Sequence, residues 1–177
     1  MFVDTENGFV RREAFTSQEV YRDELARIFD KSWIYLGHES EIPEPGDYVT
    51  RQLGSAPVIV IRTEGGDVRV LLNSCRHRGM ELVEKPCANA KVICCPYHSW
   101  TYGLDGRLVR TPEVGGPGVG EADDIDRTAL GLLPIRVETW LDFIFVNLSC
   151  EASALNDLID PLVKLWAAYD LSLLKHG

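Results

Sequence analysis

The sequence lacks an apolar run long enough to cross a bilayer. Its longest stretch without Asp, Glu, Lys or Arg runs from Val92 to Leu104 and includes proline, histidine and other polar residues. A transmembrane helix needs about 20 mostly apolar residues, so we expect no membrane-spanning segment. Near the N-terminus Asp4 and Glu6 precede Arg11 and Arg12, which is the wrong order and the wrong composition for a secretory signal. Together these absences predict a cytoplasmic protein.

Basic residues are scarce relative to acidic ones. The 177 residues include 18 Lys and Arg against 27 Asp and Glu, which gives a formal net charge of −9 at pH 7. This balance disfavours a broad phosphate-binding surface, so we expect no nucleic-acid partner. Apolar residues make up 45% of the chain and charged residues 25%, which are ordinary proportions for a folded globular protein.

The central part of the sequence, residues 33–150, has the residue pattern of an antiparallel β domain. Short β-branched and aromatic runs alternate there with Gly and Pro, so the fold class we expect is mainly β. The predicted strands are 33–37, 48–53, 58–62, 68–72, 91–94, 100–102, 135–139 and 143–147.

Helical segments flank the predicted β domain. Thr16 stands three positions before Glu19, and apolar residues then recur at helical spacing, which predicts a capping box and a helix ending near Ser32. Beyond residue 150 the apolar residues return to a helical period, and Pro161 is expected to begin a second helix there.

Two short segments combine one sulfur and one nitrogen ligand each. They are Cys75-Arg76-His77 and Cys95-Pro96-Tyr97-His98. Two thiolates can hold one iron of a [2Fe–2S] cluster while two neutral imidazoles hold the other, which is the ligand set of a Rieske centre. We therefore expect Cys75 and Cys95 to bind one iron, and His77 and His98 to bind the second.

A structural zinc site is the alternative for the same four residues, because Cys and His also satisfy tetrahedral zinc. Zinc fingers usually place two Cys in one pair and two His in the other, whereas each segment here is mixed. The pattern therefore favours the cluster. The other cysteines, Cys87, Cys94 and Cys150, have no histidine at ligand spacing and are interpreted as buried or partly buried thiols.

These motifs resemble the Rieske domain of the large (α) subunit of bacterial aromatic-ring-hydroxylating dioxygenases. The resemblance is carried by residues 73–80 (NSCRHRGM) and 95–106 (CPYHSWTYGLDG), and it extends through nearly the whole chain. The sequence departs from the family pattern at Ser99 and Asp142, where glycine is usual. The fold it implies is a Rieske-type antiparallel β-sandwich with a smaller cluster-binding subdomain, flanked by an N-terminal helix and C-terminal helices.

The same resemblance implies a division of the chain into three parts. They are an N-terminal helical segment at 1–32, a Rieske [2Fe–2S] domain at 33–150 with cluster-binding loops at 75–80 and 95–100, and at 151–177 the helical start of a truncated catalytic domain.

The function implied by this resemblance is electron relay within a ring-hydroxylating dioxygenase, an oxidoreductase of aromatic hydrocarbon catabolism. Electrons would come from a ferredoxin or an NAD(P)H-dependent reductase and pass to a mononuclear Fe(II) site present only in the full-length protein. After His98 the chain has only His176, so it cannot assemble the two-His, one-carboxylate site of such an iron. We expect this chain to contain no catalytic residue and to transfer electrons only.

The resemblance also implies assembly and leaves one alternative. When full length, such proteins are expected to form a homo-oligomer, often a trimer, or an α/β hetero-oligomer. The alternative function is a self-standing Rieske-type ferredoxin that acts as an electron carrier. Carriers of that kind resemble the cluster domain alone, whereas this chain has substantial segments before and after it, which favours the oxygenase.

Overall fold

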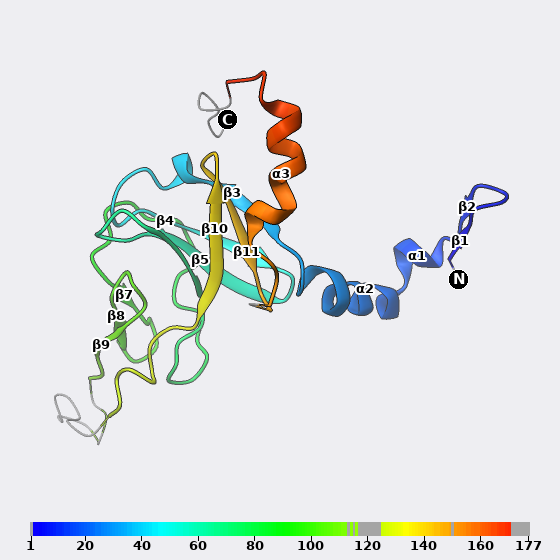
Figure 1. Cartoon of the computed structure of the whole chain (residues 1–177). Helices are drawn as coiled ribbons and strands as arrows, with labels where there is room; N and C mark the ends of the chain where they lie inside the picture. Colours follow the sequence, from blue (N-terminus) through cyan, green and yellow to red (C-terminus); the bar gives the residue numbers. More distant parts are fainter. Residues whose placement is uncertain (1, 113, 115, 117–124, 150, 171–177) are drawn as a thin grey trace.

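The computed structural model describes residues 2–112, 114, 116, 125–149 and 151–170 (Figure 1). Its body is a six-stranded antiparallel sheet with the order β3-β11-β10-β6-β5-β4, accompanied by a three-stranded sheet with the order β7-β8-β9. The mainly β, antiparallel fold with a smaller subdomain is therefore confirmed. The strands of the two sheets are β3 (Ile34–His38), β4 (Tyr48–Leu53), β5 (Ala56–Arg62), β6 (Val68–Leu72), β7 (Ile93–Cys94), β8 (Thr101–Tyr102), β9 (Leu108–Arg110), β10 (Pro134–Trp140) and β11 (Phe143–Asn147).

Strand β5 is buried on both of its faces. Successive side chains of a strand point to opposite sides, so Val58 and Val60 enter one core while Ile59 and Ile61 enter a second core. All four are at most 2% exposed, which explains the uninterrupted apolar run in this part of the sequence. The first core also contains residues of β3, β6 and β11. The second core contains residues of the three-stranded sheet and both candidate ligand cysteines, and we call it the ligand core.

The longer strands were predicted well, and the two-residue strands β7 and β8 lie within the predicted runs 91–94 and 100–102, but three other short strands were not predicted. Strands β4, β6 and β11 have the predicted bounds. Strand β9 was not predicted, since its three residues become a strand only by pairing with β8. The same holds for β1 (Val3–Asp4) and β2 (Phe9–Val10), which pair only with each other.

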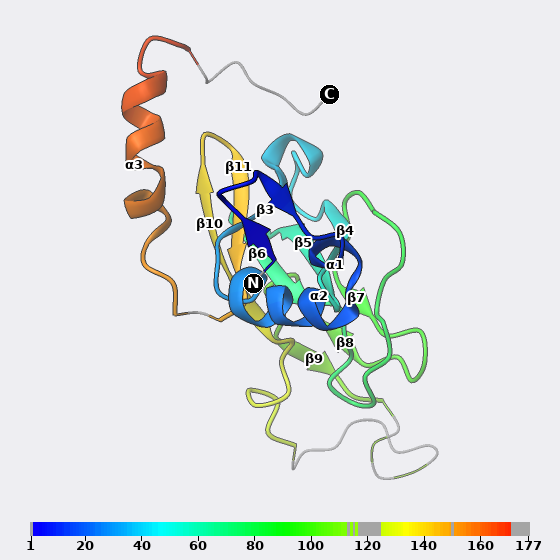
Figure 2. The same ribbon diagram turned by 90° about the vertical axis from the view of Figure 1, so that its right-hand side faces the viewer.

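The N-terminal segment is not the single capped helix that the sequence predicts. It contains α1 (Glu13–Thr16), α2 (Gln18–Glu24) and a π-helical turn at Leu25–Phe29, and it extends away from the sheets (Figures 1 and 2). The predicted capping box at Thr16 is wrong. Ser17 caps α2 by accepting a hydrogen bond from the Val20 N–H at 3.4 Å, whereas the Thr16 hydroxyl donates to the Arg12 carbonyl within α1.

Helix α3 (Leu155–Trp166) is continuous through Pro161, so the prediction of a second helix beginning there is wrong. Apolar residues on both sides of the proline line one cavity together with residues of β3, β10 and β11. Leu155 and Ile159 are buried before the proline, and Trp166 stacks on Trp140 of β10 after it, with ring centroids 5.7 Å apart. In the described ranges no helix is long and apolar enough to span a membrane.

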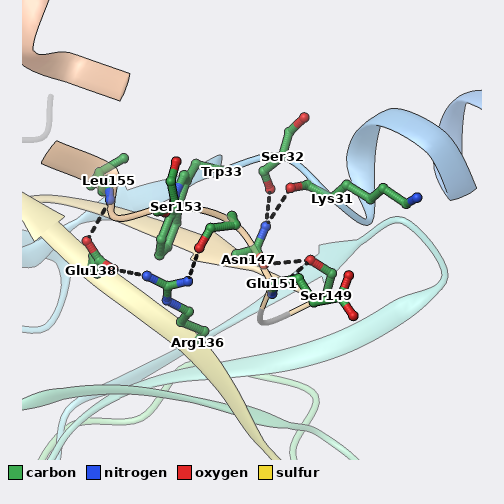
Figure 3. A network of polar contacts seen from close by, with 11 residues as sticks. Lys31, Ser32, Trp33, Arg136, Glu138, Asn147, Ser149, Glu151, Ser153 and Leu155 are labelled. Atoms are coloured by element: carbon green, nitrogen blue, oxygen red, sulfur yellow. Dashed lines mark hydrogen bonds and ion pairs between the residues drawn. The ribbon is translucent and has the colours of Figure 1, made fainter. Parts of the chain in front are cut away.

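A polar network fixes the start of α3 to the sheet (Figure 3). The Glu138 carboxylate accepts hydrogen bonds from Arg136 at 2.6 Å and from the Leu155 N–H at 2.9 Å, so a negative group lies at the N-terminus of the helix. The Arg136 guanidinium in turn lies 4.7 Å from the Trp33 ring centroid, and the Trp33 indole N–H donates to the Ser153 carbonyl at 2.9 Å. Helix α3 is thus attached to both β10 and the start of β3.

Candidate metal centre

The loop at residues 75–80 is closed by its own backbone. The Cys75 N–H donates to the Met80 carbonyl at 2.8 Å, and the Gly79 N–H donates back to the Cys75 carbonyl at 2.8 Å. Gly79 has φ of +70°, in the left-handed region that glycine adopts without a steric penalty. This closure places Cys75 inside the ligand core, where it is 3% exposed, and leaves His77 half-buried at the loop tip.

The loop at residues 95–100 repeats the same hydrogen bonds. The Cys95 N–H donates to the Trp100 carbonyl at 2.8 Å, and the Ser99 N–H donates to the Cys95 carbonyl at 3.0 Å. Ser99 therefore occupies the place that Gly79 occupies in the first loop, and it has the same left-handed backbone, with φ of +57°. Asp142, the other departure from the family's glycine pattern, is also left-handed, with φ of +64°. Both turns keep their geometry without glycine.

The two loops bring a pair of thiols together in the ligand core. Cys75 and Cys95 are 3% and 2% exposed and lie close enough for their side chains to hydrogen-bond. Burial raises the pKa of Cys95, and the neighbouring Cys75 thiol adds to that increase, whereas the backbone N–H groups of Tyr97 and His98 lower it. Two thiolates this close and this buried repel each other, so the pair is suited to sharing a cation.

The two imidazoles lie together at the loop tips. The ring centroids of His77 and His98 are 4.9 Å apart, and the Nδ1 atom of each is buried with no hydrogen-bond partner. Burial lowers the pKa of His77, and the charges of Arg78 and His98 lower it further. A neutral imidazole with an unpaired, buried ring nitrogen is the form that binds metals.

Aromatic rings pack around both imidazoles. Trp100 stacks on His77 with centroids 4.8 Å apart and an interplanar angle of 8°, while Tyr97 lies over His98 with centroids 3.6 Å apart. Trp100 is 5% exposed and Tyr97 is 56% exposed. The first ring therefore belongs to the core, and the second lies over His98 at the surface.

Two further residues hold the loop at 75–80 or the chain that directly follows it, Tyr102 at the loop and Asn73 at residues 81–83. The buried Asn73 amide accepts hydrogen bonds from the backbone N–H groups of Leu82 and Val83 at 3.0 and 3.1 Å. The fully buried Tyr102 hydroxyl lies 3.3 Å from the Cys75 sulfur, and burial, then the Cys75 thiol, raises the pKa of Tyr102. Neither residue stands in a recognisable ligand pattern, so only the fold reveals these contacts.

The other cysteines and histidines stand apart from this centre. Cys87 and Cys94 are exposed free thiols, so the expectation that they are buried or partly buried is wrong. Each lies on a short or irregular segment at the surface of the subdomain, where the thiol stays accessible to solvent. His38 is buried beside Phe143 of the larger sheet. Cys150 and His176 lie outside the described residues.

The donor set fits a cluster of two irons better than a single metal ion. Among the described residues, no three His, Cys, Asp or Glu side chains are grouped to hold one ion. The four candidate ligands instead form a thiol pair in the core and an imidazole pair at the tips. Each iron of a mixed-ligand [2Fe–2S] cluster takes two protein ligands of one kind, which matches this two-by-two arrangement.

Comparison with known proteins also points to a [2Fe–2S] cluster domain. Residues 32–128 match the family model described as Rieske [2Fe–2S] domain. The chain is 40% identical over 156 residues to the biphenyl 2,3-dioxygenase α subunit of Rhodococcus jostii (strain RHA1), an alignment that covers 87% of this chain and 33% of that protein. The chain thus spans about a third of the length of the curated relatives it matches.

Solved structures extend the likeness to three dimensions. Naphthalene 1,2-dioxygenase from Rhodococcus sp. bound to indole superposes with a TM-score of 0.80 at 37% identity, over 90% of this chain and 36% of that one. The quaternary ammonium Rieske monooxygenase CntA superposes with a TM-score of 0.78 at 31% identity, over 88% of this chain and 44% of that one. The similarity therefore includes a dioxygenase and a monooxygenase.

Proposed function

This chain belongs to the Rieske [2Fe–2S] domain family, and from that premise we propose that it is the electron-relay part of an aromatic-ring-hydroxylating oxygenase α subunit. The observation that carries the proposal is the pair of buried thiols beside two imidazoles whose Nδ1 atoms have no partner. The likeness to dioxygenase α subunits covers 87% of the chain, well beyond residues 32–128, which disfavours the alternative of a self-standing ferredoxin.

In this proposal each iron of the cluster is bound by two of the four candidate residues. Cys75 and Cys95 supply thiolates to one iron from inside the ligand core, and His77 and His98 supply Nδ1 to the other iron. When bound, such a cluster takes up and passes on one electron. The backbone N–H groups of Tyr97 and His98, which hydrogen-bond the Cys95 sulfur, stabilise its negative charge.

The surroundings of the ligands suit an electron site close to the surface. The thiols are almost completely buried, so water is kept from the sulfur ligands, while the half-buried imidazoles form the side that a partner can approach. Arg76 and Arg78 are exposed on either side of His77, and neither ligand loop contains a carboxylate, although the chain as a whole has a net charge of −9. This local positive charge favours an acidic donor protein, either a ferredoxin or an NAD(P)H-dependent reductase.

We propose the same division of the chain that the sequence suggests. Residues 1–32 form a helical segment, residues 33–150 the cluster domain, and residues 151–177 the start of a catalytic domain that would hold a mononuclear Fe(II) in the full-length protein. Oxidation of an aromatic ring would occur there, in an oligomer that is a homotrimer or an α/β assembly. This chain itself would accept and pass on electrons without oxidising a substrate, and a cytoplasmic location remains a prediction.

Anaerobic reconstitution of the purified chain with iron and sulfide tests the proposal. We expect two irons and two acid-labile sulfides per chain, a coloured protein, and an absorption and EPR spectrum of the mixed Cys and His type. A colourless chain that binds one zinc ion with the same four residues would overturn it. Product formed from an aromatic substrate by the reduced chain alone, with O₂, would overturn the proposed division of labour.

A further inference from the structure

The thiols of Cys75 and Cys95 form a pair inside the protein. They are 3% and 2% exposed, pack in the same core, and lie within hydrogen-bonding distance of each other. Each cysteine begins its own loop, and the backbone hydrogen bonds that close the two loops fix both positions. The contact between the two sulfurs is therefore built by the polypeptide itself.

The exposed cysteines of the described chain have no such partner. The Cys87 thiol neighbours the Tyr48 hydroxyl, and the Cys94 sulfur accepts a hydrogen bond from the Thr101 hydroxyl at 3.8 Å. Cys94 precedes Cys95 directly, but consecutive side chains of an extended chain point to opposite sides, and here the first thiol is exposed while the second is buried. Among the described cysteines, only the buried two have a second thiol beside them.

A buried thiol pair can give up its protons in two ways. As two thiolates it needs a cation, because two negative charges this close together in a core repel each other and are poorly solvated. As a disulfide it carries no charge, which suits an apolar core. The disulfide bond is about 2.0 Å long, so the two sulfurs have only to close from hydrogen-bonding distance to bonding distance.

Resting on the proposed function, we infer that Cys75 and Cys95 form a redox switch for cluster insertion, in which hydrogen peroxide joins the two sulfurs in a disulfide. Peroxide first transfers one oxygen to one thiol, which gives a sulfenic acid and water. The second thiol then attacks that sulfur, so the S–S bond forms, the S–O bond breaks and a second water leaves. Overall the two thiols lose two electrons and two protons, and one peroxide is reduced to two waters.

The disulfide form cannot accept the cluster. It removes both thiolates from the iron that they would bind, and only the imidazole pair remains. A dithiol reductant reverses the change by thiol–disulfide exchange. Burial also selects the oxidant, because peroxide is small enough to enter the core, whereas glutathione disulfide meets the exposed thiols of Cys87 and Cys94 first.

The test uses a chain with Cys87→Ser, Cys94→Ser and Cys150→Ser, which leaves Cys75 and Cys95 as its only cysteines. The reduced, iron-free chain is treated with stoichiometric hydrogen peroxide. Intact-mass measurement should show the loss of two hydrogens, and non-reduced peptide mapping should find one intramolecular disulfide. Anaerobic reconstitution should then give no cluster, and dithiothreitol added before it should restore two irons and two sulfides per chain.

The native chain keeps the inference testable if that variant does not fold. In the folded native chain, peroxide should join Cys75 to Cys95 and no other pair, whereas the chain unfolded in urea should give a mixture of pairings. Cys75→Ser should stop at a sulfenic acid on Cys95, which dimedone traps. The inference is overturned if the pair stays reduced while the exposed thiols are oxidised, or if the disulfide form takes up a cluster as well as the reduced form.

The proposed function fails in a different measurement. If the reduced native chain assembles no cluster, the ligand assignment is refuted and the switch has nothing to control. If the reduced chain assembles a cluster but peroxide forms no disulfide between Cys75 and Cys95, only the switch is refuted. Iron and sulfide analysis of the reduced chain, performed before any peroxide is added, distinguishes the two failures.

Discussion

The two ligand loops have the same backbone hydrogen bonds but different support. In each, the N–H of the cysteine binds the carbonyl five residues later, and a left-handed residue precedes that carbonyl. Tyr102 contacts the loop at 75–80, and Asn73 holds the chain directly after that loop. The loop at 95–100 instead joins the strands β7 and β8, which pair directly with each other. One geometry can thus be held by side chains or by a short hairpin, and the two should respond differently to substitution.

The largest effect is expected where the loops are equivalent. Replacing Cys75 or Cys95 by Ser should abolish cluster assembly in either case, because each sulfur supplies half of one iron's protein ligands. The control is Cys94→Ser, which removes an exposed thiol directly beside Cys95 and should leave iron and sulfide content unchanged. Retention of two irons and the native spectrum in either ligand variant would contradict the assignment.

The next largest effect concerns stability, and it should differ between the two loops. Asn73→Ala removes the acceptor for the Leu82 and Val83 N–H groups in a site that is 1% exposed, and we expect a loss of ~2–3 kcal/mol in the free energy of unfolding. Since these bonds support the chain that follows the loop at 75–80, the cluster should also be lost at a lower denaturant concentration than that which unfolds the sheet. Parallel denaturation curves followed by visible absorption and by circular dichroism measure this difference.

Asn147→Ala is the matched control for Asn73→Ala. Asn147 is 0% exposed and donates to the carbonyls of Lys31 and Ser32 at 2.9 and 3.0 Å, far along the chain from both ligand loops (Figure 3). It should destabilise the fold to a similar degree while colour and fold are lost together. If both variants gave coincident transitions, Asn73 would have no special role in supporting its loop.

A smaller effect tests the left-handed position shared by the loops. Gly79→Ser should destabilise the chain by ~1 kcal/mol, because a side chain at positive φ is strained there even though the nearest atom to an added Cβ, the Ser74 hydroxyl, is 3.9 Å away. Ser99→Gly relieves the same strain in the second loop and should stabilise by ~0.5–1 kcal/mol, partly offset by the greater freedom of glycine in the unfolded chain. Chemical denaturation of the two variants would give opposite signs, and equal signs would contradict the equivalence of the positions.

The smallest expected change in stability is at a left-handed turn outside the ligand loops. Leu141 and Asp142 have φ of +51° and +64° between the paired residues Trp140 and Phe143, which is a two-residue turn of type I′. Asp142→Gly should stabilise by ~0.5 kcal/mol, less than Ser99→Gly, since Asp tolerates this region better than most residues. Thermal unfolding should show the gain, while the visible spectrum stays native. A spectral change would mean that this turn is coupled to the ligand loops.

Much of the fold could be predicted because it depends on local pattern. Alternating apolar residues gave the bounds of β4 and β6, and the mixed Cys and His spacing predicted which four residues the fold brings together. The helix across Pro161 could not be predicted, because a proline inside an apolar helical pattern usually ends or kinks the helix. The contact of Tyr102 with Cys75 is likewise invisible in sequence, since it joins residues 27 positions apart through tertiary structure alone.

Strand β5, which is buried on both faces, couples the unfolding of the two cores. Val58 and Val60 complete one core, and Ile59 and Ile61 complete the other, so neither layer can melt while the other keeps its strand. Unfolding is therefore cooperative across both layers, and the β5 amide protons exchange with solvent only through global opening. A mutation that weakens the larger sheet should therefore destabilise the ligand core as well, because both cores depend on the same strand.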